Sequence, residues 1–546
     1  PRFWSGPSTS PSPRQPKKKP VNATTTREPP KKNFHMLSRK SEAVNQVTFD
    51  EDYNVPDTKP DVGRMIQKKG EVVIEDVEVS EGQANIRGNL KFYLLYVGEG
   101  DDNRVYSLTG ELAIDEILHL QGLESGDKIC LKWEIEDLSL HVINSRKLNA
   151  KALVSFEAAV DELMQVQIPI EIKEAADVSR KMKNIRVLGL GVHKKDTLRL
   201  KKEITLASNK PNIHEILWND IEVRGLDIRA GADSVAVKGE LFVFALYSAD
   251  DDSDPLQWVE QAIPFSEHVA CPGCTLEMIP NIEASLLQTT AQVKPDVDGE
   301  ERILQVEAML ELEMKIYREG EYTLIQDVYT PHRQCIPVRQ ERTLERLLVK
   351  NYSKCRVAER TALEEPRGKV LQICHSDGSV KVDSAETVKD GIRVEGIIQV
   401  RILYIVSDDD MPFYSVETAV PFSHVVEASG IVDSCRTCLR ADLEQLSTSM
   451  ADSSDIEIKA VLNLNALVLG RMTENIMVSV EEKEVDRKAR SAMPGILCYQ
   501  VQEGDSLWDI ARTFCTTMEE ISSLNQLEGE ELTPGASLIL VKRVEE

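Results

Sequence analysis

Aromatic residues, cysteines and long apolar runs are all scarce in this chain of 546 residues. Only 5% of the residues are aromatic, and 10 irregularly spaced cysteines are too few for a disulfide-rich secreted scaffold, so we expect a reducing compartment. No stretch approaches the roughly 20 consecutive apolar residues of a membrane-spanning helix. The apolar core of a signal peptide is missing after Pro1 and after Met36. We therefore expect a non-exported protein without an integral membrane segment.

Positive charge is in deficit, with 65 Lys and Arg against 91 Asp and Glu and a net charge of −26. Such a field repels phosphate backbones, so we expect no nucleic-acid partner. The length corresponds to roughly three to five domains of ordinary size.

Residues 1–35 differ from the rest of the chain. They hold 8 of the 24 prolines and eight basic residues against the single acid Glu28, with almost no apolar periodicity. This composition predicts disorder. The first methionine is Met36, so a second interpretation is upstream sequence that precedes the true start.

Three internal repeats occupy most of the chain. Each contains a nine-residue segment that begins with glycine and ends with Leu-Tyr: Gly88–Tyr96, Gly239–Tyr247 and Gly396–Tyr404. Related features flank each segment, including an upstream proline at Pro60, Pro211 or Pro366. The predicted repeats span 36–180, 181–335 and 336–490.

Within each repeat the apolar residues mostly alternate, as in 71–79 and 131–140, with Gly, Asp, Asn and Ser between the runs. This pattern predicts antiparallel strands in a sandwich or a packed pair of sheets. A short helical turn is expected after the starting proline, because apolar residues there have helix spacing: Val62, Met65 and Ile66, or Ile213, Ile216 and Leu217.

The C-terminal segment 496–543 has the most specific motif. A strand is expected at 499–501, helices through Leu507 and Ile510 and through Met518 and Ile521, and a return strand at 538–541. This segment resembles a LysM domain, a β-α-α-β module. The resemblance implies a shallow groove for N-acetylglucosamine polymers, lined by Gly504, Asp505, Ser506, Leu507, Trp508, Asn525, Pro534 and Gly535.

Two features of this segment qualify the resemblance. Cys515 stands where the family often has a small residue, and the acidic run Glu528–Glu531 lies near the groove. The second feature disfavours glycan binding. Leu507, Ile510 and Leu524 are also interpreted as core residues of the module.

Three β-rich repeats followed by one LysM module resemble the SPOCS-domain proteins of endospore-forming bacteria, over about 40–541. The resemblance implies a mainly β chain of three sandwich-like SPOCS repeats before the LysM domain. It also implies a spore-coat morphogenesis factor in the mother-cell cytoplasm, at the outer forespore membrane. The implied partners are the coat's morphogenetic ATPase and other coat proteins.

Two kinds of candidate ligand site in the repeats carry little weight. An acidic loop follows each Leu-Tyr segment, but Pro255 and Gln261 replace required residues of a calcium loop in the second copy. A solvated turn or a docking site for a basic surface remains open there. Cys271 with Cys274, and Cys435 with Cys438, have the spacing of zinc ligands. Aligning Glu283 with Glu444 offsets the two pairs, so reduced thiols are favoured, with late disulfide formation as the alternative.

No catalytic motif is recognisable: there is no phosphate loop, nucleophile elbow or His-Glu-x-x-His helix, and the nine histidines are scattered. We therefore expect no enzyme activity, cofactor or metal. The favoured function is a multivalent scaffold in coat assembly, whose LysM module binds protein. The alternative is a cell-wall protein that binds N-acetylglucosamine polymers, and an unrecognised enzyme is a third hypothesis.

Overall fold

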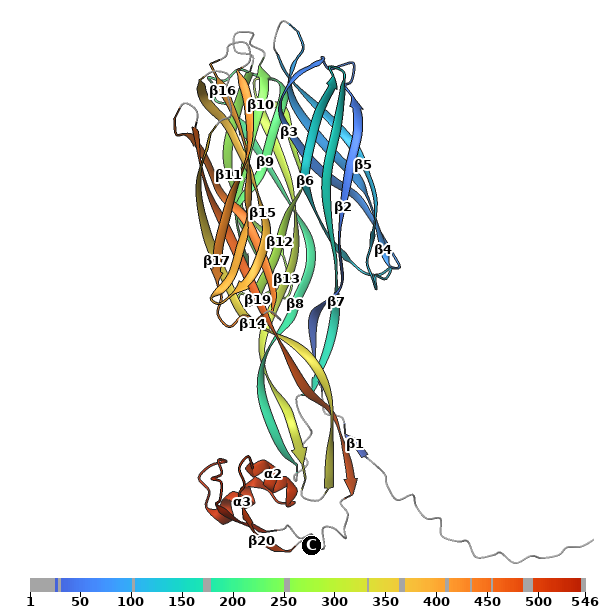
Figure 1. Cartoon of the computed structure of the whole chain (residues 1–546), viewed down its shortest axis with the longest axis vertical. Helices are drawn as coiled ribbons and strands as arrows, with labels where there is room; N and C mark the ends of the chain where they lie inside the picture. Colours follow the sequence, from blue (N-terminus) through green and yellow to red (C-terminus); the bar gives the residue numbers. More distant parts are fainter. Residues whose placement is uncertain are drawn as a thin grey trace, which may run out of the picture.

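The computed structural model describes residues 25–27, 31–100, 104–169, 178–249, 256–330, 333–362, 369–407, 412–432, 435–452, 455–484 and 494–541. They form an elongated β-rich body, a narrower stem and a small terminal module (Figure 1). The acidic loop residues 101–102, 250–254 and 408–410 lie outside the described residues. In the part of the chain that is described, neither helix has the length and apolarity of a membrane span.

The body consists of three lobes, each built from the six antiparallel strands of one repeat. The first lobe contains β2 (Lys31–Asn54), β3 (Val62–Ser80), β4 (Gln83–Gly98), β5 (Val105–His119), β6 (Ile129–Asn144) and β7 (Lys147–Pro169). The second contains β8 (Ser179–Thr205), β9 (Ile213–Ala230), β10 (Ser234–Ala249), β11 (Leu256–Ala270), β12 (Ile279–Pro295) and β13 (Glu301–Tyr329). The third contains β14 (Arg333–Ala362), β15 (Val370–Val388), β16 (Gly391–Val406), β17 (Phe413–Glu427), β18 (Arg436–Met450) and β19 (Asp455–Glu484).

Every lobe pairs its strands in the same order. The second, third and fourth strands form one sheet with the third in the middle, and the first, sixth and fifth form another with the sixth in the middle. The two sheets enclose a separate apolar core in each lobe, and residues from both sheets contribute to it. The predicted mainly β, sandwich-like architecture is confirmed.

The N-terminal segment contains more structure than its composition predicted. β1 (Thr25–Arg27) pairs with the end of β19, and β2 begins at Lys31, before Met36. The prediction of disorder is therefore wrong for these residues, which gain backbone hydrogen bonds from strands of the repeats. The other residues of 1–35 lie outside the described part of the chain.

The Leu-Tyr signature has a physical explanation at the end of each lobe's third strand. Tyr96, Tyr247 and Tyr404 are buried, and the Tyr96 and Tyr247 hydroxyls donate to the carbonyl oxygens of Pro60 and Pro211 at 2.9 and 3.4 Å. Successive side chains of a strand point to opposite faces, so the leucines before these tyrosines, Leu95, Leu246 and Leu403, point away from the core of their own lobe. Together they enter a shared cluster, here called the axial core, whose buried members are Ile66, Leu95, Val97, Val105, Leu217, Trp218, Phe244, Leu246, Cys374, Leu403 and Phe413.

The expected helical turns are wrong, because these residues lie in strands β3 and β9. Two β-bulges occur at the start of each second strand, and the second bulge leaves Ile66, Leu217 or Cys374 unpaired. A bulge adds one residue to the two-residue alternation and so produces spacings of three or four. The bulged residue of each repeat belongs to the axial core, which brings the three lobes together.

The glycine of the repeat signature lies where the third strand approaches the second most closely. A methyl group added at Gly88 or Gly396 would overlap the carbonyl oxygen of Val73 or Lys381, and at Gly239 it would lie 3.1 Å from that of Arg224. In this register only glycine lets the strands meet without a backbone shift.

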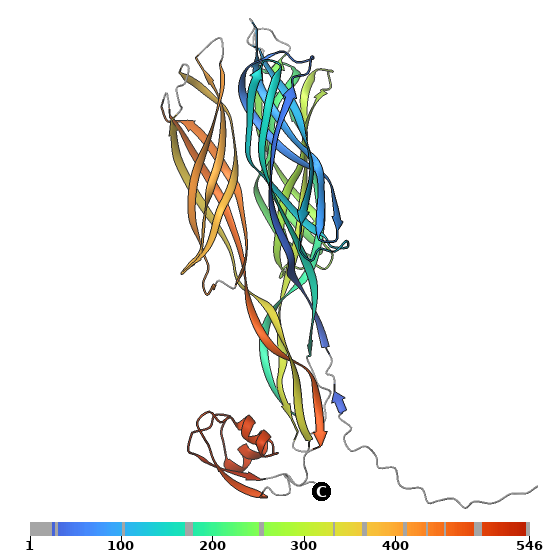
Figure 2. The same cartoon turned by 45° about the vertical axis from the view of Figure 1, so that its right-hand side comes forward.

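The stem is formed by the ends of the long strands β8, β13, β14 and β19, as both views show (Figures 1 and 2). Two further apolar clusters hold these strand ends together, and the first also includes Met36 of β2. Met36, Ile185, Val187, Leu324, Leu344 and Ile476 form one, and Ile325, Val328, Cys335, Met477 and Val480 form the other. The stem therefore joins the lobes and carries the terminal module at its end.

Candidate functional site

The terminal module has the predicted β-α-α-β order. β20 (Ile496–Gln500) pairs with β21 (Ser537–Val541), and α2 (Leu507–Thr513) and α3 (Met518–Asn525) lie between them. The Ser506 side chain caps α2 by accepting from the Asp509 amide, and Thr517 with Glu520 forms a capping box on α3. These caps explain why helices this short begin where they do.

Two predicted groove loops lie side by side. The Val501 amide donates to the Ala536 carbonyl and the Gly535 amide donates to the Val501 carbonyl, both at 2.8 Å. Gly504 and Gly535 have φ angles of 92° and 87°, a region that favours glycine. Gly504, Pro534 and Gly535 are exposed. The structure therefore joins the start of the first loop, at Val501, to the second loop at Gly535, and it leaves Gly504, Pro534 and Gly535 exposed.

The polar predicted residues are largely engaged in holding the module together. Asp505 Oδ2 accepts from the Tyr499 hydroxyl and the Gln502 amide, both at 2.8 Å. Asn525 lies away from the two loops, where its side chain donates to the Ile539 carbonyl at 2.9 Å and accepts from the Ile539 amide at 2.7 Å. Its role is to hold α3 against β21.

The apolar predictions had mixed outcomes. Leu507 and Ile510 are 2% and 3% exposed, as expected for core residues. Leu524 is 49% exposed, so its assignment to the core is wrong. Helix spacing could not reveal this, because α3 ends one residue later and it is Asn525, not Leu524, that faces β21 in its last turn.

Trp508 connects the module to the stem. It is only 5% exposed, its Nε1 donates to Asp327 Oδ2 at 3.2 Å, and its ring meets the edge of Tyr329 at 4.7 Å between centroids. Arg512 Nη1 donates to the same carboxylate oxygen at 2.8 Å. Asp327 and Tyr329 end β13, so no motif within the module could predict this contact.

One face of the β20–β21 pair exposes apolar side chains, and Leu524 of α3 is exposed as well. Ile496 is 70% exposed, Ile539 and Leu524 are each 49% exposed, and Cys498 pairs with Ile539 across the two strands. We call Ile496, Cys498, Leu524 and Ile539 the apolar face. The exposed acids Glu528, Glu530 and Glu531 follow α3 in the chain. Neighbouring exposed apolar side chains, as at Ile496, Cys498 and Ile539, are typical of a protein-binding surface.

Family comparisons identify both parts of the chain. The model described as "SipL, SPOCS domain" matches residues 61–143, 212–294 and 369–451, and the LysM domain model matches 499–541. The chain is a SPOCS-repeat protein with a LysM domain. Searches of curated proteins and of solved structures found no significant match. This combination fits a sporulation coat protein with a peptidoglycan-binding type of module, and both domains belong to non-catalytic families.

The three SPOCS domains meet at buried charges beside the axial core. Lys69, Asp220 and Asp377 occupy equivalent positions, opposite the fifth residue after the signature glycine in each lobe. Lys69 donates to Asp220 across the first and second domains. Within the third, Arg401 Nη2 donates to Asp377 at 2.7 Å. The charge difference at this repeated position thus lets the first and second domains form an ion pair there, while Asp377 is neutralised within the third domain.

His375 completes this axial charge cluster. Its Nδ1 lies 2.9 Å from Glu260 Oε2 and its Nε2 lies 3.5 Å from Asp220 Oδ2. Burial opposes the imidazolium, but the Asp220 and Glu260 carboxylates outweigh it and raise the pKa of His375 to about 9. Burial also raises the pKa of Asp377. Sequence analysis missed this cluster because it combines residues from separate SPOCS domains.

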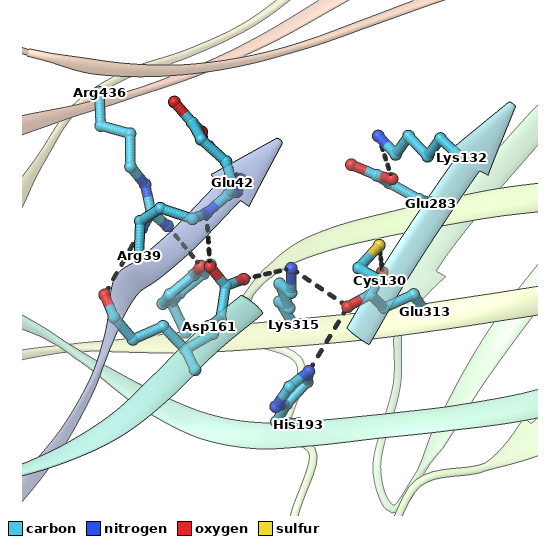
Figure 3. Close-up of polar contacts among 12 residues, drawn as sticks. Arg39, Glu42, Cys130, Lys132, Asp161, His193, Glu283, Glu313, Lys315 and Arg436 are labelled. Carbon is cyan, nitrogen blue, oxygen red and sulfur yellow. Dashed lines mark hydrogen bonds and ion pairs between the residues drawn. The ribbon is translucent and has the colours of Figure 1, made fainter. Parts of the chain in front are cut away.

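A second polar junction joins the first and second SPOCS domains (Figure 3). Asp161 of the first domain accepts from Lys315 of the second at 2.9 Å, and Lys315 also pairs with Glu313 at 3.1 Å. Glu313 accepts from Cys130 at 3.1 Å. Burial opposes ionisation of Glu313, but contacts with His193, Cys130 and Lys315 hold its pKa well below the ordinary value. Burial, followed by the Glu313 contact, raises the pKa of Cys130 to about 12.

The two cysteine pairs do not occupy equivalent positions in the structure, as predicted. The alignment of Glu283 with Glu444 on which that prediction relied is wrong, however. The shared bulge of the fifth strand matches Leu287, not Glu283, with Glu444. Cys271 and Cys274 are buried at a turn in the second SPOCS domain, and burial raises the pKa of Cys271. A buried thiol with a raised pKa is a poor nucleophile.

Proposed function

We propose that this protein is a non-enzymatic scaffold of endospore coat assembly that binds the coat's morphogenetic ATPase through its LysM domain, with further coat proteins on the SPOCS domains. The mother-cell side of the outer forespore membrane is the proposed location. The observation that carries the proposal is the docked LysM domain, whose Trp508 contact fixes it on the stem while the apolar face remains exposed. A fixed module loses less orientational entropy when a partner binds than a freely tethered one.

The chemistry of the apolar face favours protein over glycan as the partner. Ile496, Leu524 and Ile539 offer no hydrogen-bonding side chains for sugar hydroxyls, whereas they can bury apolar surface of a partner at about 25 cal/mol per Å². The acids Glu528, Glu530 and Glu531 would favour basic residues beside that apolar surface. The three SPOCS domains add further surfaces, so several weak contacts combine into durable attachment.

A second candidate function is binding of N-acetylglucosamine polymers. The adjoining loops at Gly504 and Pro534–Gly535 favour it, because their exposed backbone could follow a chain of sugars. On this hypothesis the protein attaches to peptidoglycan and the SPOCS domains act as spacers.

The test compares the full chain with a version that lacks 496–546, using the purified coat ATPase. An Ile539→Asp variant tests the apolar face, and Leu276→Asp is its control, because Leu276 is 77% exposed in the second SPOCS domain. We expect the truncation and Ile539→Asp to lose the ATPase and Leu276→Asp to keep it. If the intact chain does not bind the ATPase but sediments with purified peptidoglycan, the glycan-binding hypothesis replaces the scaffold hypothesis.

A further inference from the structure

The axial charge cluster contains three metal-ligating side chains within reach of one ion. Asp220, His375 and Asp377 each offer a ligand atom, and these atoms all lie within 4.8 Å of one another. The three residues are 1%, 2% and 6% exposed. Asp220 comes from β9 of the second SPOCS domain and the other two from β15 of the third. The LysM domain and its partner surface play no part in this arrangement.

Two of these buried side chains have an atom without a hydrogen-bond partner. Among the described residues, Asp377 Oδ2 makes no hydrogen bond, and His375 Nε2 makes none either, although it has an ion-pair contact with Asp220 Oδ2 at 3.5 Å. Their other polar atoms are engaged, because His375 Nδ1 contacts Glu260 and Asp377 Oδ1 accepts from Arg401. A buried polar atom without a hydrogen bond is unfavourable, so two such atoms at one site favour an occupant that contacts both.

The surroundings have the chemistry of a metal site. A histidine that binds metal usually gives its second nitrogen to a carboxylate, and Glu260 has that relation to His375. One imidazole nitrogen and two carboxylate oxygens suit first-row divalent ions better than Mg²⁺ or Ca²⁺, which prefer oxygen ligands alone. We propose that Asp220, His375 and Asp377 bind one divalent transition-metal ion, such as Zn²⁺ or Co²⁺, that cross-links the second and third SPOCS domains.

Nearby cations set the strength of this site. Lys69 and Arg401 each hold a carboxylate oxygen of Asp220 or Asp377, which orients both ligands but repels a metal ion. The metal also displaces any proton from His375 Nε2. An ion can reach the site through a cavity of about 720 Å³ between the SPOCS domains, because Asp220 and Asp377 are both among its lining residues. These opposing charges predict moderate affinity that increases when Lys69 is neutralised.

In the experiment, the full chain is first stripped of metal with a chelator, then incubated with Co²⁺ and passed through a gel-filtration column. We expect the eluted protein to retain one Co²⁺ per chain. Its spectrum should show no thiolate-to-cobalt charge-transfer band, and excess Mg²⁺ should not displace the ion. Asp377→Asn should lose the ion. Asp442→Asn should keep it, because Asp442 lines the same cavity but pairs with Arg440. Circular dichroism of each variant shows whether the fold survives.

A third variant separates a metal site from a structural charge cluster. Lys69→Met removes a repelling charge, so we expect at least tenfold tighter Co²⁺ binding and a larger rise in melting temperature when Co²⁺ is added. A chain that retains no Co²⁺ would overturn the proposal and leave water as the occupant. Retention accompanied by a thiolate band, or retention that Asp377→Asn does not change, would also overturn it by placing the ion elsewhere.

Discussion

Asp327→Asn should release the LysM domain from the stem. The carboxylate accepts from Trp508 and Arg512 through one oxygen, and Asp327 is 8% exposed. Arg512 is 40% exposed, so losing its ion pair costs only about 1 kcal/mol. The buried Trp508 N–H would face an amide or lose its acceptor, at a further cost of about 1–3 kcal/mol. The equilibrium ratio of docked to undocked LysM domain should therefore fall by about 30- to 1000-fold.

Small-angle X-ray scattering and hydrogen exchange measure this change. Undocking should increase the radius of gyration and the exchange of amides in 321–329 and 507–513, while the melting temperature of the SPOCS body stays the same. Glu528→Gln is the control, because it removes an exposed charge of the same module away from the contact. If Asp327→Asn and the wild type have superimposable scattering curves and exchange rates, the contact does not fix the module.

Three further predictions concern the SPOCS domains. Gly396→Ala should lower the free energy of unfolding by about 2–4 kcal/mol, and Gly239→Ala by clearly less, because its added methyl group has more space; equal losses in urea titrations would contradict the argument. Glu313 has a lowered folded-state pKa, so it stabilises the fold above its ordinary pKa of 4.5 and loses this contribution as the pH falls; Glu313→Gln should make urea stability less dependent on pH between about 5 and 3. Exposed Cys498 should react with a thiol reagent before Cys130, whose pKa is about 12, and mass spectrometry of the labelled peptides would show the order.

The repeat architecture could be predicted from the sequence because the same local packing requirements recur in each lobe and select the same residues. Glycine allows the close approach of two strands, and the following tyrosine packs into its own lobe and anchors the starting proline. Alternation then identifies the strands. The same reasoning failed at Ile66 and Leu217, because a bulge changes the spacing of buried residues until it imitates a helix.

The meeting of separate elements could not be predicted in the same way. Trp508 belongs to a helix start in its own module, and only the three-dimensional structure places Tyr329 against it. Likewise, Lys69, Asp220 and Asp377 occupy equivalent positions in sequence, but nothing in one repeat indicates that these positions face one another. Long-range contacts of this kind depend on which faces the lobes bury together.

The axial core also has a consequence for assembly at low abundance. Three separate chains that met through Leu95, Leu246 and Leu403 would dissociate on dilution, whereas lobes joined in one polypeptide remain together at any concentration. Identical subunits would also carry the same residue at all three central positions, and three lysines or three aspartates there would repel. A single gene can place lysine in one lobe and aspartate in the others, so the joined form makes available an asymmetric centre that a homotrimer cannot have.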